Sequence, residues 1–347
     1  MTLTTSEIRP PEWDSLAAST ADFEVSPQWL EAMAPLLPGE PRWLVAHVDG
    51  QPQIGLHTRL LKTPPEEPRY DIAAVLRGDI PSLEPRPILL SKAPDSESLY
   101  PAVLALLPGY TCVPAGPGAT DPDLLAGTLR AMDTWAGQQG ARSVSFLYVP
   151  ERQKILQRAL EEFGARPVAL YPTCVMPVTF GSMEEYLTQL GGGRRAGLRR
   201  LLRWLDETGM TLGEEDLSEV REEVLELRMG LLRKYHHSAD DRDAQLATID
   251  RIVRNYPPAD RALTTLRRGD QMVGFTLGLR HGDTLRGLWS GQLPEARGAY
   301  FLLVFYGEVE AALRRGITSL NYGTLQWQEK ISFGCRLEQL VGHTWSL

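Results

Sequence analysis

The densest group of chemically useful side chains follows three glycines, Gly191–Gly193. Five arginines come directly after them: Arg194, Arg195, Arg199, Arg200 and Arg203. Three of these arginines, at 195, 199 and 203, are spaced four residues apart and would form one stripe on a helix. Guanidinium groups bind phosphates through paired hydrogen bonds, and glycines let a phosphate approach a helix start closely. The pattern predicts either a phosphate-binding helix or a solvated basic face.

The charge pattern favours the first alternative. No carboxylate follows the arginines until Asp206 and Glu207. Like charges on one helix repel by roughly 0.2–0.5 kcal/mol per pair, so an unneutralised row favours a bound anion. The phosphates could belong to the backbone of a tRNA acceptor end or to coenzyme A.

Lys330 is the second candidate. It follows an expected central strand, Ser319–Tyr322, and ligands collect beyond the carboxyl ends of strands in open α/β sheets. A cation there could stabilise the oxyanion of an acyl transfer or a donor phosphate. The alternative is a surface lysine on a short helix. Tyr322 is either a donor to a leaving group or a core aromatic residue.

Further candidates depend on single side chains. His237, beside His236, ends an expected helix and could act as a general base toward an amine. A histidine at a helix end can equally serve as a cap at the negative pole of the helix dipole. Trp289 and Trp327 could line a substrate cleft or belong to the core.

Two halves of the chain share three landmarks in the same order. They are a Gly-to-Gly turn, a Gly-x-x-Ser strand opening and a Phe-Gly step, at 50–55 and 269–274, 140–146 and 316–322, and 163–164 and 333–334. This order predicts a duplicated α/β unit. We expect domains at 1–170 and 171–347, with a final strand, Glu338–Trp345, that completes the second sheet or returns to the first.

Each half is expected to contain a helix, hairpin strands, a helix, a strand, a short helix and a strand. Such an order predicts mixed sheets with helices on both faces. The more specific expectations are a helix from Pro122 capped by Asp121, a capping box at Ser182–Glu185, one strand at Pro167–Val178, helices at Leu217–Tyr235 and Tyr300–Arg315, and an irregular insertion at 62–100.

Composition excludes several classes of protein. The 347 residues carry a formal charge of −8, which argues against a whole-surface nucleic-acid binder and hence against DNA as a partner. Three separated cysteines and six histidines give neither a disulfide framework nor a metal-ligand spacing. No apolar run is long enough to span a membrane, and no secretory signal is visible, so we expect a cytoplasmic protein.

The order of elements resembles the acetyltransferase fold of the GNAT superfamily, present twice. A tandem pair resembles the Fem-like aminoacyl-tRNA-dependent ligases and the related BioF-like acetyltransferase family. The phrases that carry the resemblance are Tyr186–Leu190 before the arginines, Tyr322-Gly323, and Lys330–Gly334. Two features depart from Fem-like ligases: Glu329 stands where an aromatic residue is usual, and no coiled-coil arm is visible.

The resemblance implies an amide-forming N-acyltransferase with its active-site cleft in or beside the second domain. Aminoacyl-tRNA would be the co-substrate, no cofactor would be tightly bound, and the acceptor would be a small amine or a peptide. The arginines would hold donor phosphates, with Lys330 near the transferred acyl group. The first domain would form a wall of the cleft and contact the acceptor. Alternatives are an acetyl-CoA-dependent N-acetyltransferase and a catalytically degenerate ligand-binding protein.

GNAT enzymes typically hold coenzyme A with a Gln/Arg-x-x-Gly-x-Gly/Ala loop. The corresponding segment here is Pro294–Tyr300, in which Gly298 fits. Glu295 replaces the Gln or Arg, and a carboxylate beside a pyrophosphate is unfavourable. Tyr300 replaces the small residue and is instead a candidate for substrate contact. In the first half Pro117 removes an N–H donor, so Gly116–Ala119 is interpreted as an ordinary turn.

Overall fold

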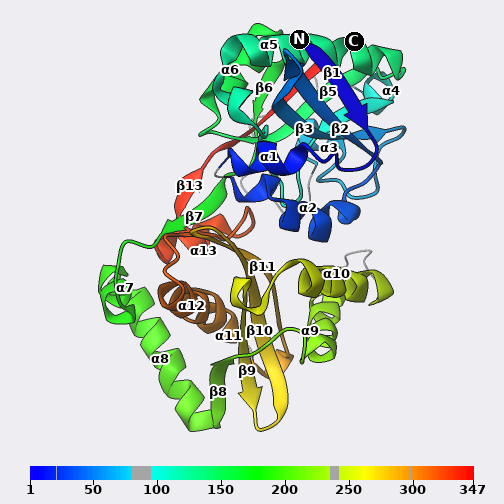
Figure 1. Cartoon of the computed structure of the whole chain (residues 1–347). Helices are drawn as coiled ribbons and strands as arrows, with labels where there is room; N and C mark the ends of the chain where they lie inside the picture. Colours follow the sequence, from blue (N-terminus) through cyan, green and yellow to red (C-terminus); the bar gives the residue numbers. More distant parts are fainter. Residues whose placement is uncertain (21, 80–94, 235–241, 297) are drawn as a thin grey trace. The chain divides into compact units, whose positions relative to one another are not determined.

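The computed structural model describes the chain except residues 21, 80–94, 235–241 and 297. It folds into two compact units, one formed by Met1–Thr173 with Glu338–Leu347 and the other by Cys174–Leu337. Each unit contains one seven-stranded mixed sheet with helices packed against it (Figure 1).

The first sheet holds the N-terminal strands and, near its far edge, the last strand of the chain. Its order is β1 (Thr2–Ser6), β2 (Glu40–Val48), β3 (Gln51–Leu61), β4 (Ala102–Ala105), β5 (Ser143–Pro150), β14 (Leu340–Ser346) and β6 (Arg166–Ala169). Neighbours from β1 to β4 are antiparallel, whereas β4 and β5 are parallel. The helix between β4 and β5 makes the crossover that a parallel pair requires.

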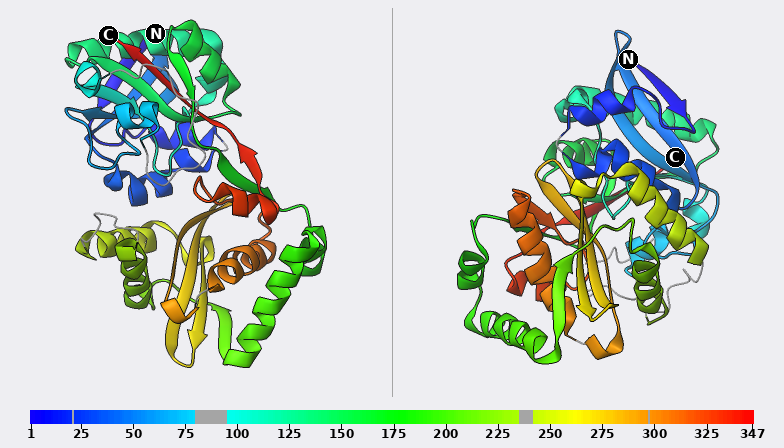
Figure 2. Two further views of the ribbon diagram at one scale, coloured as in Figure 1. Left: turned by 180° about the vertical axis from the view of Figure 1, so that it is seen from behind. Right: turned by 60° about the horizontal axis from the view of Figure 1, so that its bottom comes forward.

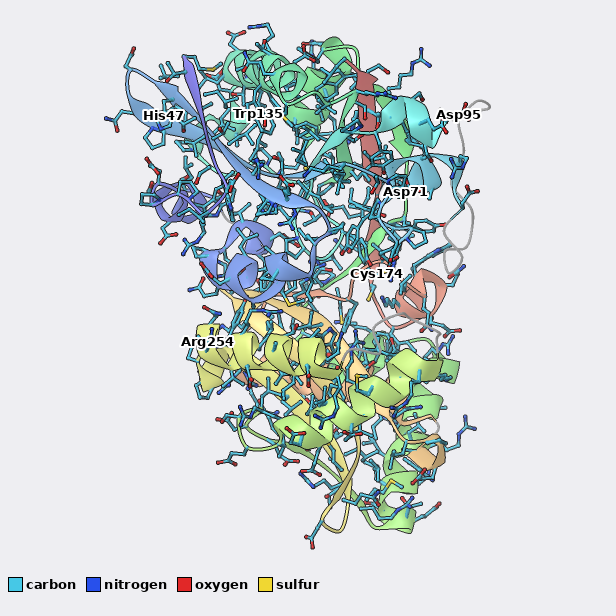
Figure 3. All side chains as sticks on the ribbon, turned by 90° about the vertical axis from the view of Figure 1, so that its right-hand side faces the viewer. His47, Asp71, Asp95, Trp135, Cys174 and Arg254 are labelled. Carbon is cyan, nitrogen blue, oxygen red and sulfur yellow. The ribbon has the colours of Figure 1, made fainter. Side chains whose placement is uncertain are left out.

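The first unit contains the helices α1 (Trp13–Ala18), α2 (Pro27–Met33), α3 (Ile72–Arg77), α4 (Ser96–Leu99), α5 (Pro122–Gln138) and α6 (Lys154–Glu162). Asp71, labelled in Figure 3, caps α3. Asp121 caps α5 as predicted, accepting from the N–H groups of Asp123 and Leu124 at 2.9 and 3.1 Å. Side chains of α5 and α6, including Leu129 and Leu160, pack on β5 in one apolar core.

The second sheet has the order β13 (Arg336–Glu338), β7 (Thr173–Pro177), β12 (Ser319–Asn321), β11 (Thr284–Gln292), β10 (Gln271–His281), β9 (Arg261–Arg268) and β8 (Met210–Glu214). Strands β9 to β11 form an antiparallel meander. β11 and β12 are parallel, like β4 and β5.

The helices of the second unit are α7 (Met183–Gln189), α8 (Gly192–Thr208), α9 (Arg221–Lys234), α10 (Arg242–Asn255), α11 (Ala299–Leu302), α12 (Glu308–Arg314) and α13 (Trp327–Ser332). A π-helical turn, Leu303–Gly307, joins α11 to α12, so the predicted helix is continuous but widened at its centre. Figure 1 shows α9 and α10 on one face of this sheet and α11 and α12 on the other.

The capping box expected before α8 is present in α7. The Ser182 hydroxyl accepts from the N–H of Glu185 at 3.2 Å, and the Glu185 carboxylate accepts from the N–H of Gly181 at 2.7 Å. The returning bond goes to Gly181 rather than to Ser182, one residue earlier than in the usual motif.

Two predicted single strands are each divided between the sheets. The segment Pro167–Val178 supplies β6 to the first sheet and β7 to the second, so the prediction of one strand there is wrong. At the other end, β13 belongs to the second sheet, whereas β14 lies between β5 and β6, as the red strand in Figure 2 shows. Alternation of side chains indicates a strand but does not tell which of two sheets it joins.

Several elements give weak sequence signals. Strand β4 has the four buried residues Ala-Val-Leu-Ala, too short a run to distinguish from a loop. Helix α10 begins at Arg242, with Asp243 in its first turn. Among the helices that the structure describes, none combines enough length and apolar character to cross a bilayer.

Candidate active site

The second sheet separates between its two parallel strands. β11 pairs with β12 at only three positions, Thr284 to Arg286, and then continues to Gln292 beside β10 alone. We call this place, after Arg286, the β11–β12 parting. It lies at the carboxyl end of the parallel pairing, where β12 ends and β11 continues, and α/β sheets commonly bind ligands at such a place.

A β-bulge lies at the parting, and beyond it the side chains of β11 point to the opposite face of the sheet from the one that regular alternation would give. Leu277 pairs with Trp289 and Gly278 with Gly287, so Leu288 is the extra residue. As a result, Gly287 faces α12, whereas Trp289 faces α9, where the guanidinium of Arg228 lies 5.0 Å from its ring centre. Trp289 is therefore buried on the face opposite to α12.

Lys330 is buried at the parting, with 5% of its surface exposed. Its ammonium donates to the carbonyl oxygens of Tyr322 at 2.6 Å and Gly323 at 3.4 Å, just beyond β12. Burial lowers the pKa of Lys330, and the nearby carboxyl of Glu308 opposes that shift. Lys330 is therefore not a surface lysine, which was one of the two alternatives expected from the sequence. Its third N–H has no acceptor among the described residues and is available to another group.

Tyr322 packs as a core aromatic residue. Its hydroxyl donates to the carbonyl of Val304 in the π-helical turn at 3.2 Å, and its ring lies 5.4 Å from that of Phe305. Burial raises the pKa of Tyr322 well above its usual value. The hydroxyl proton is thus engaged with the helix backbone.

Glu308 is the residue that the sequence analysis missed. It begins α12 with 1% of its surface exposed, and Thr276 of β10 donates to its Oε1. Its Oε2 has no hydrogen-bond partner among the described residues. Burial raises the pKa of Glu308 to about 7, against the lowering effects of Thr276 and Lys330. The available signal was a carboxylate within the apolar stripe formed by Val304, Phe305, Val309 and Ala312.

Two cysteines complete the surroundings of Lys330. Cys174 of β7, labelled in Figure 3, and Cys335 are both buried. Burial raises their pKa values, to about 11 and about 12, although Lys330 opposes both shifts. Both thiols are therefore protonated at neutral pH and poor nucleophiles. Among the described residues, no group of three or more His, Cys, Asp or Glu side chains could hold a metal.

The predicted basic helix is α8, and its arginines do not all share one environment. Arg194 turns toward α13, where it forms an ion pair with Glu329 at 2.6 Å and lies over the ring of Phe333. Arg199 forms an exposed ion pair with Glu184 at 3.0 Å. In the described parts of the chain, Arg195 and Arg203 have no ion-pair partner. The apolar face of α8 is buried through Leu198 and Leu205.

The remaining predicted residues lie near the start of α11, at the start of α13 or outside the described residues. Gly298, with φ of 100°, immediately precedes α11, and a Cβ atom there would lie 3.8 Å from Leu201 of α8. Tyr300 and Trp327 are half-buried and pack against the core cluster that contains Tyr322. His237 lies outside the described residues.

Residues 192–330 match a family model described as the acetyltransferase (GNAT) domain. These residues lie within the second unit, so the match confirms the predicted GNAT fold in this half and supports the predicted acyltransferase activity. A comparison with curated protein sequences gives no match.

Solved structures extend the likeness to the whole chain. FemX aligns over 99% of this chain and 97% of its own with a TM-score of 0.65 and 13% identity. A conserved protein of unknown function from Bacteroides thetaiotaomicron VPI-5482 gives 0.58, at 13% identity and 99% of both chains. L-PGS from Bacillus licheniformis gives 0.56, at 12% identity, over 97% and 92%. At such identities the likeness is one of fold, and it extends over both units of the chain.

Proposed function

We propose that this protein forms amide bonds by transferring an aminoacyl group from aminoacyl-tRNA to the amine of a small molecule or a peptide. The observation that carries the proposal is the arginine stripe, Arg195, Arg199 and Arg203, on the same GNAT domain that buries Lys330. The helix that bears the stripe packs beside the start of α11, through Leu201 near Gly298. A polyanionic donor fits this combination, and the Fem-like resemblance implies the same donor.

The stripe is available for phosphates. Arg195 and Arg203 have no ion-pair partner among the described residues, and Arg199 is 49% exposed beside a Glu184 that is 69% exposed. An exposed pair of this kind contributes about 0–1 kcal/mol, so a phosphate can displace the carboxylate at little cost. Three arginines along about two helical turns match a nucleic-acid backbone better than one pyrophosphate.

The segment before α11 disfavours coenzyme A. Glu295 is exposed in the short 3-10 helix Pro294–Ala296, so its carboxylate would lie near a pyrophosphate at the start of α11. Tyr300 fills the position of a small residue, with its ring 5.5 Å from that of Phe301. Both features favour a donor whose phosphates lie elsewhere, along α8.

Lys330 would serve the reacting centre. The ester that joins an amino acid to tRNA is already activated, so an amine can attack it directly once both are held in place. Negative charge then develops on the carbonyl oxygen. The free N–H of the buried ammonium is a suitable donor to that oxygen, and its interaction is strengthened by the low polarity around it.

A transfer assay tests the proposal. Total tRNA charged with tritiated amino acids and, separately, radiolabelled acetyl-CoA are incubated with the protein and a pool of primary amines that includes diamines, amino sugars and amino-acid amides. We expect label in new amides from the charged tRNA alone. Transfer from acetyl-CoA alone would establish the second candidate, which Gly298 at the start of α11 supports. Binding of a donor without transfer would indicate a degenerate ligand-binding protein.

The arginine stripe has its own test. Arg203→Glu should weaken binding of aminoacyl-tRNA by about tenfold and reduce the salt dependence of log Kd by roughly one phosphate contact. The matched control is Arg158→Glu on the exposed face of α6, which should leave binding unchanged. Equal affinities for the wild type and Arg203→Glu would refute the role of the stripe.

A further inference from the structure

The carboxyl of Glu308 has an unusual environment for a structural group. It is almost completely buried, one of its oxygens accepts from Thr276, and the other has no partner among the described residues. Leaving a buried charge without a partner costs several kcal/mol, so a carboxylate that served packing alone would be at a disadvantage to an apolar residue. The free oxygen is therefore the feature to explain.

The free oxygen faces the β11–β12 parting. A Cβ atom on Gly287 would lie 3.2 Å from Oε2 and 3.5 Å from the ring of Tyr322, so the carboxyl, this glycine and the tyrosine ring meet at one place. Gly287 is the first residue of β11 after the pairing with β12 ends, and it is half-buried. Because residue 287 is a glycine, it places no side chain between the parting and the carboxyl group of Glu308.

Three charged or titratable side chains outside α12 interact with the carboxyl group of Glu308. Lys330 of α13 is close enough for its charge to oppose the rise in the pKa of Glu308. Tyr322 and Cys335 also interact electrostatically with the carboxyl group, and both remain protonated at neutral pH. No ion pair within 4.0 Å engages Glu308 among the described residues. A cationic ligand could therefore complete the site.

We propose that Glu308 is a catalytic residue that binds the ammonium group of the acceptor at the β11–β12 parting and removes a proton from it. This inference rests on the proposed amide-forming transfer and assigns its acceptor class, a primary alkylammonium. A carboxyl group with a pKa of about 7 is well matched to this task, because half of it is ionised at neutral pH.

The proton balance is complete without another reagent. Oε2 of the ionised carboxyl takes one proton from the ammonium, which becomes a neutral amine. The amine nitrogen attacks the ester carbonyl carbon, and the C–O bond to the terminal ribose breaks. The second proton lost by the nitrogen passes to the ribose oxygen. Amide, uncharged tRNA and a protonated Glu308, which returns its proton to solvent, are the products.

The experiment measures kcat/KM between pH 5.5 and 9.5 with aminoacyl-tRNA and the amine from the pool that accepts label. Glu308→Gln keeps the shape of the side chain and its ability to accept from Thr276, but it cannot take a proton. We expect a loss of about 10²–10⁴-fold at pH 7 and a rate that rises with pH until the amine itself is deprotonated. Affinity for aminoacyl-tRNA should change less than twofold.

Two further variants separate catalysis from structure. Glu310→Gln changes an exposed glutamate of the same helix that pairs with Arg314, and it should retain wild-type rates and pH profile. Glu308→Asp should restore part of the rate and the wild-type form of the profile. Wild-type kcat/KM and pH profile in Glu308→Gln would overturn the inference while leaving the proposed transfer intact. Absence of transfer by the wild type from charged tRNA would instead overturn the proposed function.

Discussion

The parallel strand pairs of the two units begin alike and end differently. In the first unit β4 pairs with β5 at four positions, and the chain then turns and fills the space beyond β4 with its own backbone. The N–H of Cys112 donates to the carbonyl of Tyr148 at 3.1 Å, and Ala115 exchanges two backbone bonds with Gly55 of β3. In the second unit no such segment follows β11 at the parting among the described residues, and Lys330 donates to the carbonyls beyond β12 instead.

The two strand pairs also differ in the charge of the residues buried beside them. The residues after β4, among them Leu106, Leu107 and Cys112, are buried and uncharged. The second unit buries Glu308 and Lys330 at the matching place. Lys154, which opens the short helix of the first unit, is 68% exposed and forms a surface ion pair with Glu151. Both units thus keep the parallel strand pair, whereas, among the described residues, charged side chains are buried beside the end of the pairing in the second unit.

The largest expected effect is on the rate of transfer, and it concerns the buried charges of the second unit. Lys330→Met preserves length and burial but removes the ammonium, so under the proposed mechanism the developing oxyanion would lose its donor. We expect kcat to fall by roughly 10²–10³-fold. Lys154→Met, at the corresponding helix of the first unit, should leave kcat unchanged. Activity near the wild-type level in Lys330→Met, with thermal unfolding showing an intact fold, would remove the functional distinction between the two strand pairs.

The next effect is on stability, and it concerns the first unit, in which backbone fills the space beyond β4. Gly116 has φ of 110°, and a Cβ atom there would lie 2.2 Å from the carbonyl oxygen of Gln53. Gly116→Ala should lower the free energy of unfolding by several kcal/mol, from backbone strain of about 1–3 kcal/mol and overpacking of similar size. Gly137→Ala, near the end of α5 with open space around it, should be neutral or slightly stabilising. Denaturant unfolding measures the free energy of unfolding of both variants. Equal values would show that the backbone around Gly116 is not rigid.

The smallest expected effect is a pH dependence of stability that has opposite signs in the two units. Burial lowers the pKa values of His57 and His343 in the first unit to about 4. Their unfolded forms bind more protons, so stability is complete above pH 6.5 and is lost as the pH falls toward 4. The pKa of Glu308, raised to about 7, makes its folded form bind more protons, so its contribution to stability falls as the pH rises from 4.5 to 7.

Between pH 7 and pH 5 each group changes stability by about 2 kcal/mol. Hydrogen exchange should therefore show the first unit losing protection on acidification while the core of the second unit gains some. The half-buried His281, whose pKa burial lowers, opposes the gain in the second unit. His343→Leu should remove part of the loss in the first unit. Parallel loss of protection in both units would contradict the comparison.

Part of the site was predictable because local chemistry marks it. The arginine stripe, its glycines and Lys330 are visible as spacing, and the capping residues Asp121 and Ser182 act on groups two or three residues away. Glu308 was not among the predicted residues, because nothing local distinguishes a buried carboxylate from an exposed one. It stands out only as one polar residue in an apolar helical stripe, and its partner Thr276 is 32 residues away in the sequence.

The sequence by itself determined the duplication, the mixed α/β class, the GNAT resemblance and most element positions, since these depend on periodicity and on neighbours within a few residues. Only the tertiary structure decided which sheet each strand joins, which strand pair is filled and which charges are buried. Those outcomes depend on hydrogen bonds between distant segments, such as Ala115 with Gly55, and on burial, which sets the pKa of Glu308 and leaves one of its oxygens unpaired.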